Sequence, residues 1–322
     1  AASDAIEHTR VTRRPAFLHL KLVRLLGHAG SDVEQLYRST DEIVGAEAQD
    51  PILSTAMMLI DGGWLTPDQV LKIYEDCRTT TQALAREAVS RPKLTTVDEI
   101  VAPLAPHNPK AIEAEAQRQA PPSDRASFHG RLPEEERPRH MAMLLNRALA
   151  DMLVKHPELC IFGEDVARKG GVYHVTAGLQ EKAGVGRVFN TLLDETSILG
   201  VALGAAQMGM LPMPEIQYLA YLHNAIDQIR GEACSLQFFS NAQYANPMVV
   251  RIAGLAYQKG FGGHFHNDNS VGSLREIPGL IMACPSNGED AVGMMRTVVA
   301  AAKVDGRVSA FIEPIALYMT KD

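Results

Sequence analysis

The chain has 322 residues, 46% of them hydrophobic, and a formal net charge of -7 at pH 7. This length supports a large buried core and more than one domain. The acidic balance, without a basic stripe, argues against nucleic-acid binding, and no apolar run reaches the ~20 residues that a membrane span needs. The four cysteines form no CxxC pair, which is typical of reduced thiols. We therefore expect a cytoplasmic protein with no nucleic-acid or membrane partner.

The first 102 residues are predicted to be mostly helical. Helical patterns cover 1–11, 50–63 and 66–90, and a strand-like run covers 15–23. Two glycines end the second of these helices, and a threonine followed by a proline begins the third. One strand is too few for an independent sheet, so we interpret this part as the end of a larger domain.

Residues 103–138 differ in composition from the rest of the chain. They contain seven of the 18 prolines, mixed with charged residues. Such a stretch buries too little apolar surface to pack on its own, which predicts a linker with a short helix at 110–119.

Residues 139–322 alternate strand-length apolar runs with helical patterns. Short buried strands that alternate with helices predict an α/β fold, a parallel sheet covered by helices on both faces. In such sheets ligands bind at the carboxyl ends of the strands. The helical patterns cover 140–155, 195–210, 219–238 and 288–302. The six apolar runs are 159–166, 187–193, 213–218, 248–254, 279–286 and 308–314.

Chemically capable residues follow several of these strands. They are Glu164, Glu195, the segment 218–221 and the loop 262–268, "GGHFHND". This loop has two histidines and an acid but no third nearby ligand to complete a zinc site, so we assign no metal to it. The chain has no GxGxxG after a strand, no Walker loop, no GxSxG and no HExxH motif.

Asp194 and Glu195 stand where a strand-like run gives way to a helix-like run. An acid in the first turn of a helix satisfies free N–H groups and the helix dipole, so capping explains either residue. The apolar residues "LL" before this pair and "SILGVALG" after it would favour a carboxyl group that holds a proton readily. The residues alone leave both readings open.

These motifs resemble a known family. Residues 140–314 are similar to the beta subunit of the thiamine-diphosphate-dependent decarboxylating component of 2-oxoacid dehydrogenase complexes, of the pyruvate and branched-chain types. The resemblance runs through "FGEDVARKGGVYHVTAGLQEKAG", "RVFNTLLDETSILGVALGAAQMG", "PEIQYLAYLHNAIDQI", "MVVRIAG", "GGHFHND" and "IPGLIMACPSNGEDA". Residues 10–100 resemble the last quarter of the alpha subunit, most clearly in "RLLGHAGSDVEQLYRSTDEI". The resemblance implies a thiamine-diphosphate-binding, transketolase-like fold in an alpha–beta fusion, and we expect the chain to be a fragment of it.

The resemblance also implies roles for individual residues. Glu195 matches the glutamate that hydrogen-bonds a ring nitrogen of the aminopyrimidine, which leaves Asp194 as the helix cap. His266 matches the active-site histidine of the beta chain, although Asn267 and its neighbours replace the usual Ser-Gln-Ser. The matched cofactor-binding positions are Glu164 beside the pyrimidine-binding glutamate, Leu193 through its backbone, and Gln217 and Tyr221 against the ring.

In the alpha-like part, His28 matches a histidine beside the diphosphate and the substrate. Ala29 replaces a serine whose phosphorylation regulates eukaryotic relatives, so that control is expected to be absent. The metal motif of the family, GDG followed by an asparagine, does not occur. We therefore expect the Mg2+ ligands to lie outside this segment, on the same chain or on a partner chain.

The function implied by the resemblance is oxidative decarboxylation of a 2-oxoacid, pyruvate or a branched-chain one. The acyl group would pass to lipoamide on the acyltransferase component, within a homodimer or a heterotetramer-like assembly. Two alternatives stay open. One is an acetoin dehydrogenase or another transketolase-like enzyme. The other is a non-catalytic fragment that dimerises through "GVALGAAQMG", where Gly200 and Gly204 permit close helix contact.

Overall fold

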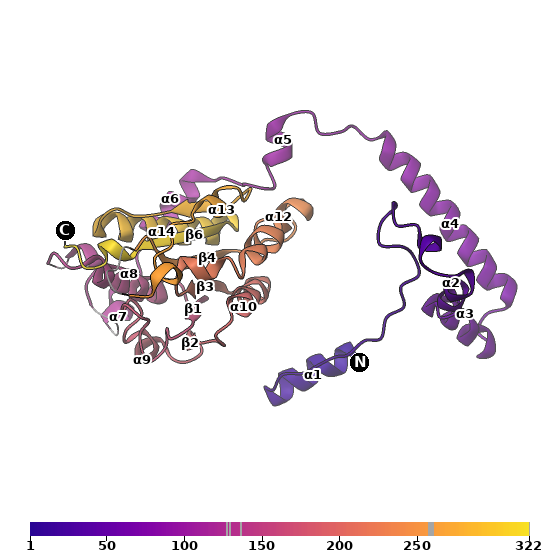
Figure 1. Ribbon diagram of the computed structural model, residues 1–322, viewed down its shortest axis with the longest axis horizontal. Helices are drawn as coiled ribbons and strands as arrows, with labels where there is room; N and C mark the ends of the chain where they lie inside the picture. Colours follow the sequence, from indigo (N-terminus) through magenta and orange to yellow (C-terminus); the bar gives the residue numbers. More distant parts are fainter. Residues whose placement is uncertain (127, 129, 136, 257–260, 322) are drawn as a thin grey trace. The chain divides into compact units, whose positions relative to one another are not determined.

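The computed structural model describes residues 1–126, 128, 130–135, 137–256 and 261–321. By their internal contacts these residues form two compact units, Ala1–Lys93 and Leu94–Asp322 (Figure 1). The sequence-based boundaries at 102 and 138 differ from this division, because the proline-rich segment belongs to the second unit.

The first unit consists of short helices and one long helix. Thr66 caps the long helix, and Gln69 reaches back to the Thr66 backbone, as its Thr-Pro start predicts. The strand expected over 15–23 is wrong: these residues, all of them described, form neither strand nor helix, because no neighbouring strand is there to pair with them. The helices are α1 Ala2–Thr12, η1 Glu34–Leu36, α2 Thr40–Glu47, α3 Pro51–Asp61 and α4 Pro67–Ser90.

The second unit is built on a six-stranded sheet in the order β2-β1-β3-β4-β6-β5, and every strand pair is parallel. Each strand lies in one of the six predicted apolar runs or, for β3, begins two residues before it. The strands are β1 Leu159–Gly163, β2 Val188–Asn190, β3 Leu211–Ile216, β4 Met248–Gly254, β5 Ile281–Ala283 and β6 Val308–Pro314.

Helices cover both faces of this sheet (Figure 1). On one face, α8 Met141–Lys155 and α14 Gly288–Asp305 pack on alternate strand residues such as Ile161. On the other face, α10 Glu195–Gln207 and α11 Leu219–Leu222 pack on the intervening ones. Successive strand side chains point to opposite faces, so two covered faces require continuous apolar runs. The predicted fold class is confirmed.

The helix predicted over 219–238 is broken in the structure. After α11 the chain forms the π-helix η3 Gln228–Ala233 and then α12 Leu236–Phe239. Gly231 lies in the π-helical turn, where the low helix propensity of glycine permits a change in backbone hydrogen bonding.

The proline-rich segment packs against the sheet-covering helices. Its helix α6 Pro109–Gln117, which agrees with the expected helix at 110–119, buries Ile112 against Ala300 and Ala301 of α14. Polar contacts add to this: the Arg296 guanidinium pairs with Glu134 at 2.9 Å. The remaining short helices are α5 Val97–Val101, α7 Pro122–Ala126, η2 Pro133–Glu135, α9 Leu179–Ala183, η4 Gly263–Phe265, α13 Gly272–Arg275 and η5 Ile315–Leu317.

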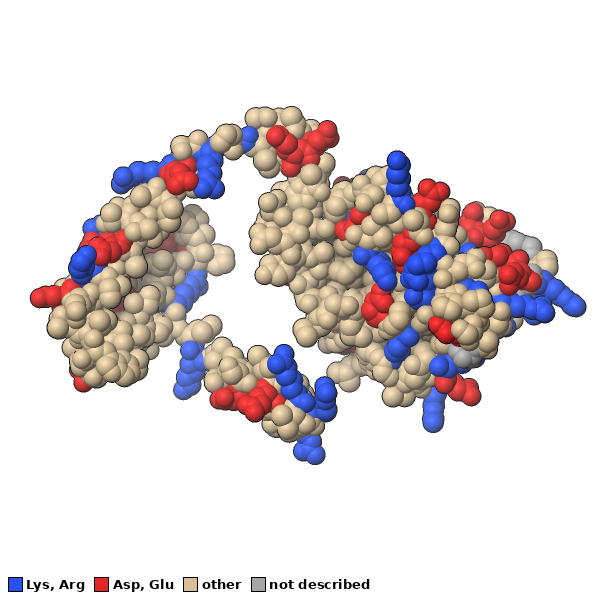
Figure 2. All heavy atoms as spheres, turned by 180° about the vertical axis from the view of Figure 1, so that it is seen from behind, with Lys and Arg blue, Asp and Glu red and all other residues tan. Residues whose placement is uncertain are grey.

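The surface of the second unit carries both signs of charge. On the face seen in Figure 2, lysine and arginine side chains are interspersed with aspartate and glutamate. Among the described residues, no helix combines the length and the apolar character needed to cross a membrane.

Candidate active site

The strand order places a topological switch point at the carboxyl ends of β1 and β3. The chain passes from β1 to β2 on one side and then returns to β3 on the other side of β1. Ligands bind at such a switch point in open α/β sheets. Glu164 directly follows β1, Gln217 directly follows β3, and α10 begins at Glu195 after β2. Three of the predicted site residues are thus placed by the sheet itself.

Asp194 and Glu195 have different roles at the start of α10. Asp194 is the N-cap, and its Oδ2 accepts a hydrogen bond from the Ser197 N–H at 2.9 Å. Hydrogen bonds from Ser197 hold the pKa of Asp194 below its ordinary value. Because Asp194 caps the helix, Glu195 is free of that role. The Glu195 residue is only 8% exposed.

The Glu195 carboxyl group is half satisfied. The Asn224 side-chain amide donates to its Oε2 at 3.3 Å. Its other oxygen, Oε1, has no hydrogen-bond partner among the described residues and is not one of their buried unpaired atoms, so it is open to solvent. A nearly buried carboxyl group with one oxygen available can hydrogen-bond a ligand, and a polar ligand group there would complete its bonding.

Aromatic side chains form a wall beside this carboxyl group. The ring of His266 lies edge-on to Tyr218 and Tyr221, with centroid distances of 4.5 Å and 5.9 Å. Tyr218 and Tyr221 also pack edge to face at 5.5 Å. The Tyr221 hydroxyl lies 3.1 Å from the His266 Nε2. The structure therefore brings two predicted residues from distant segments, Tyr221 and His266, into direct contact.

Electrostatic coupling links the wall to the two glutamates. Burial raises the pKa of Tyr221, and the charges of Glu164 and Glu195 raise it further. Burial also raises the pKa of Glu164, and nearby Asp165 and Glu195 add to the shift. Glu164 therefore retains a proton more readily than an isolated carboxyl group does. An aromatic wall beside such carboxyl groups fits a flat, nitrogen-containing ring that takes up a proton.

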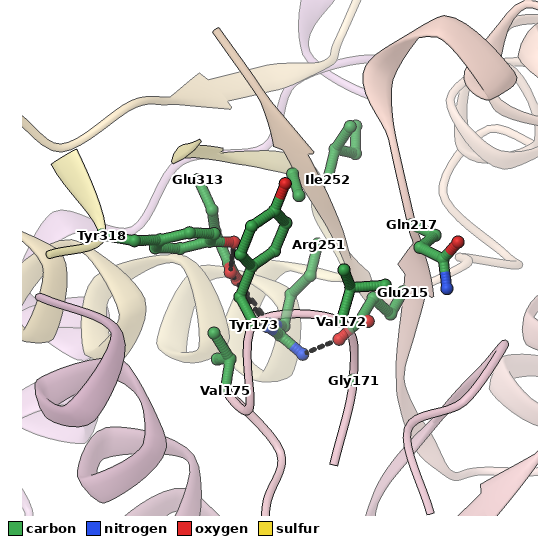
Figure 3. Close-up of a pocket in the computed structure, with 11 residues that line it drawn as sticks. Gly171, Val172, Tyr173, Val175, Glu215, Gln217, Arg251, Ile252, Glu313 and Tyr318 are labelled. Atoms are coloured by element: carbon green, nitrogen blue, oxygen red, sulfur yellow. Dashed lines mark hydrogen bonds and ion pairs between the residues drawn. The ribbon is translucent and has the colours of Figure 1, made fainter. Parts of the chain in front are cut away.

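Other predicted residues are placed less tightly. Leu193 is largely exposed in the loop before Asp194, so its side chain lies outside the core. Figure 3 shows the Gln217 amide turned away from Arg251. His28 lies exposed in the first unit, where its backbone N–H donates to Asp32 Oδ2 at 2.6 Å. The functional roles of these residues stay predictions.

A buried charge cluster beside the site was not predicted from the sequence. The Arg251 guanidinium on β4 bonds to Glu215 Oε2 and to Glu313 Oε1, each at 2.6 Å (Figure 3). The Tyr318 hydroxyl donates to Glu313 Oε2 at 2.6 Å. The cluster lines a small cavity together with Gly171, Tyr173 and Gln217.

One arginine faces two carboxyl groups in this cluster. The cluster as a whole therefore carries an excess negative charge when all three groups are ionised. Burial accordingly raises the pKa of Glu215 in spite of the nearby Arg251. The signal in the sequence was three charged residues inside apolar strands, "PEI", "VRI" and "IEP". Charged residues are almost never fully buried unless paired, so these three could have been predicted to meet.

The fold and the site define a class of protein: the chain belongs to the transketolase pyrimidine-binding domain family, whose model matches residues 137–320. A second model, that of the dehydrogenase E1 component, matches residues 1–97. The resemblance stated from the sequence is thereby confirmed, in both parts of the chain.

The relatives are beta subunits of 2-oxoacid dehydrogenases. The chain is 37% identical over 156 residues to the 2-oxoisovalerate dehydrogenase subunit beta of Bacillus subtilis, covering 48% of this chain and 47% of that one. It is 37% identical over 160 residues to the pyruvate dehydrogenase E1 component subunit beta of Staphylococcus epidermidis, with the same coverage of both chains. The chain spans about half the length of the curated relatives it matches.

Two further similarities extend this set. The 2-oxoisovalerate dehydrogenase subunit beta of Pseudomonas aeruginosa is 35% identical over 181 residues, covering 55% of this chain and 49% of the relative. Among solved structures, a split gene transketolase described as an inactive beta4 tetramer superposes with a TM-score of 0.41 and 17% identity. That superposition covers 54% of this chain and 50% of the other.

Proposed function

We propose that the chain supplies the aminopyrimidine-binding half of the active site of a thiamine-diphosphate-dependent 2-oxoacid dehydrogenase. The observation that carries the proposal is Glu195, a nearly buried carboxyl group that is free of the capping role and has one oxygen available. The family membership and the relatives support the same activity. The reaction is oxidative decarboxylation of a 2-oxoacid, and the acyl group passes to a lipoyl domain of the acyltransferase component.

The cofactor supplies a nucleophilic carbon and an electron sink for decarboxylation, chemistry that protein side chains lack. The free oxygen Oε1 of Glu195 would hydrogen-bond a nitrogen of the bound ring and exchange a proton with it. Glu164 lies close enough for the two charges to interact, which contributes to the raised pKa of Glu164. Tyr221 and Gln217 bind the ring, and Leu193 contacts it through the backbone.

The two histidines act on the substrate side of the site. In this proposal His266 serves substrate binding or acyl transfer, because it comes from the glycine-rich loop after β4 and not from α10, where Glu195 lies. His28, on the alpha-like part, serves the diphosphate and substrate end. The Mg2+ ligands come from outside these 322 residues, and lipoamide is the acyl acceptor.

The complete enzyme assembles as a homodimer or a heterotetramer-like particle, with the lipoyl acyltransferase component as its partner. Gly200 and Gly204 of α10 have open space around them, which supports close packing of this helix against another surface. Turnover of pyruvate, branched-chain 2-oxoacids and acetoin by the assembled enzyme separates the 2-oxoacid dehydrogenase from an acetoin dehydrogenase. A fragment that only dimerises would turn over none of them.

Adjacent substitutions at 194 and 195 test the proposal. In the assembled enzyme, Glu195→Gln keeps the side-chain size but removes the proton, so activity is expected to fall at least ~100-fold. Asp194→Ala is the matched control: it removes the cap, which typically costs about 1 kcal/mol, so thermal stability falls while turnover of the folded enzyme is retained. The reverse result, normal turnover in Glu195→Gln with a lowered melting temperature, would reject the assigned role.

A further inference from the structure

The segment 221–224 comprises the end of α11 and the two residues after it, and it reaches both catalytic candidates, Glu195 and His266. Leu219, Leu222 and Ala225 are buried, at spacings of three residues. On a helical turn this spacing places them on one face, which fixes the backbone against the core. Between them, Tyr221 is partly buried against the core, and His223 and Asn224 are exposed. These three side chains contact different parts of the candidate site.

The first contact determines the protonation pattern of His266. Its Nδ1 lies 3.0 Å from the Gly262 carbonyl oxygen, which can only accept a hydrogen bond, so Nδ1 carries a proton. In the neutral ring Nε2 is then unprotonated and accepts from the Tyr221 hydroxyl at 3.1 Å. Tyr221 and Gly262 together fix both the orientation and the tautomer of His266.

Gly262 is required for this arrangement. A Cβ atom at this position would lie 2.0 Å from the His266 Nδ1, and the residue has a φ of +68°. The next residue, Gly263, also has a positive φ, +54°, but nothing lies within 4 Å of the position its Cβ would take. The chain thus offers two glycines with the same backbone strain, of which only one is in contact with the histidine.

The second contact ties the histidine loop to the same segment. His223 Nε2 lies 3.2 Å from Asp268 Oδ2. Asp268 is held in turn, because its Oδ1 accepts from the Ser270 N–H at 3.1 Å and its carbonyl accepts from the Leu255 N–H at 3.3 Å. This contact between His223 and Asp268 therefore joins the segment to a loop that is already attached to the end of β4.

The third contact reaches the glutamate. Asn224 donates to Glu195 Oε2, and its carbonyl accepts from the Thr196 hydroxyl at 2.9 Å. This pair of bonds ties the first turn of α10 to the segment in both directions. With the Asn224 amide on Oε2, the oxygen of Glu195 left available is Oε1.

We propose that residues 221–224 act as one positioning device, in which Asn224 orients Glu195 while Tyr221 and the His223–Asp268 pair orient His266. The device is independent of the cofactor, but its use in catalysis rests on the proposed function. The positioning residues are Asn224, which acts through Glu195, and His223 and Asp268, which act through His266.

Nitrogen NMR of the imidazole groups in the 322-residue chain tests the device without any cofactor. At pH 8, where an ordinary imidazole is neutral, His266 is expected to carry its proton on Nδ1. Tyr221→Phe and Gly262→Ala should shift it toward a mixture of both tautomers. Gly263→Ala and His264→Ala should leave the spectrum of His266 unchanged. A mixed His266 population in the unaltered chain, or no change in Tyr221→Phe and Gly262→Ala, would overturn the assignment.

Kinetics of the assembled enzyme test the Glu195 side of the device. Asn224→Asp keeps the shape but cannot donate, and the loss of the hydrogen bond that orients Glu195 should lower kcat about tenfold, with KM for the 2-oxoacid nearly unchanged. Asn224→Gln, which keeps a donor, should recover part of this loss. Equal kcat in all three enzymes would overturn the role of Asn224. An unaltered enzyme without thiamine-dependent decarboxylation would instead reject the proposed function and leave the NMR result standing.

Discussion

The two units of the chain are stabilised in different ways. None of residues 1–93, all of which the structure describes, is buried, and apolar side chains such as Phe17, Leu22 and Trp64 are 94%, 87% and 70% exposed. The second unit buries apolar residues on both faces of a six-stranded sheet. Since burial of apolar surface is the main favourable term in folding, the first unit lacks that contribution within its own residues.

In the first unit, local interactions within the helices take the place of apolar burial. Capping boxes begin α2 and α4, and the exposed pair Lys72–Asp76 joins successive turns of α4. Such contacts are worth a few tenths of a kcal/mol to about 1 kcal/mol each, and an isolated helix as short as α2, with 8 residues, is marginal in water. Capping residues and neighbouring ion pairs are thus sufficient to define helices in the first unit without a buried core. The contrast with the second unit also implies that the first unit needs another surface to become stable.

Hydrogen exchange on the whole chain should give the largest difference between the units. Amides of α3 and α4 open locally, whereas amides of β4 and β6 exchange only through global unfolding. With an ordinary global stability of at least ~5 kcal/mol, protection in β4 should exceed that in α4 at least ~10⁴-fold. Mass spectrometry of exchanged peptides measures this ratio. Comparable protection in α4 and β4 would refute the contrast between the two units.

Removing one partner of an ion pair should lower stability strongly in the second unit and hardly at all in the first. Arg251→Met leaves two carboxyl groups buried without a counter-charge, so the free energy of unfolding should fall by about 3–5 kcal/mol. Lys72→Met breaks an exposed pair and should change stability by little or nothing measurable. Urea denaturation of both variants, followed by the far-UV circular dichroism of the whole chain, compares their free energies of unfolding.

An internal control accompanies the Arg251 variant. Adding Glu215→Gln and Glu313→Gln removes the unpaired charges, so the triple variant should be more stable than Arg251→Met alone. A triple variant that is less stable would mean that the cluster acts through packing and hydrogen bonds rather than through charge.

The strands could be predicted because each covered face imposes its own apolar residues. Because both faces are covered, "LCIFG" is apolar throughout and "MVVRIAG" is apolar except for the paired Arg251. Such continuous apolar runs can be recognised in a single sequence. The first-unit run over 15–23 has the same local pattern but no pairing strand. Its local pattern alone therefore could not distinguish strand from irregular chain.

Within the site, predictability depended on distance along the chain. Glu195 and Asp194 could be assigned from neighbouring residues and the resemblance, because a helix start is a local feature. The contacts of Arg251 with Glu215 and Glu313 depend on the sheet order, which places β4 between β3 and β6. Asn224 and Asp268 stayed unrecognised because nothing near them in the sequence indicates their partners.

Acid should destabilise the second unit through His156. Burial, with the charges of Lys155 and Lys303, lowers the pKa of His156 from 6.5 to about 4, so the unfolded chain binds its proton more tightly than the folded one. The stability contributed by neutral His156 is fully present above pH 6.5 and is lost as pH falls toward 4. The loss over this range is about 3 kcal/mol.

Substitution should remove this acid sensitivity. In His156→Gln the decline in unfolding free energy between pH 6.5 and 4.5 should be much smaller than in the unaltered chain. His19→Gln, on an exposed histidine of the first unit, should leave the decline unchanged. A decline that survives in His156→Gln would assign the acid sensitivity to carboxyl groups instead.

The smallest expected effect is that of Mg2+ on cofactor binding by the 322-residue chain. The second unit holds the residues proposed for the aminopyrimidine, and the GDG metal motif does not occur in the sequence. A ligand that binds only the folded state stabilises it according to its concentration and Kd, so the melting temperature reports binding. Thiamine diphosphate should raise the melting temperature of the second unit slightly, and adding Mg2+ should not raise it further. Glu195→Gln should reduce even this small rise, which controls for binding elsewhere on the chain. Tight, Mg2+-dependent binding in calorimetry would mean that ligands within these residues complete the metal site.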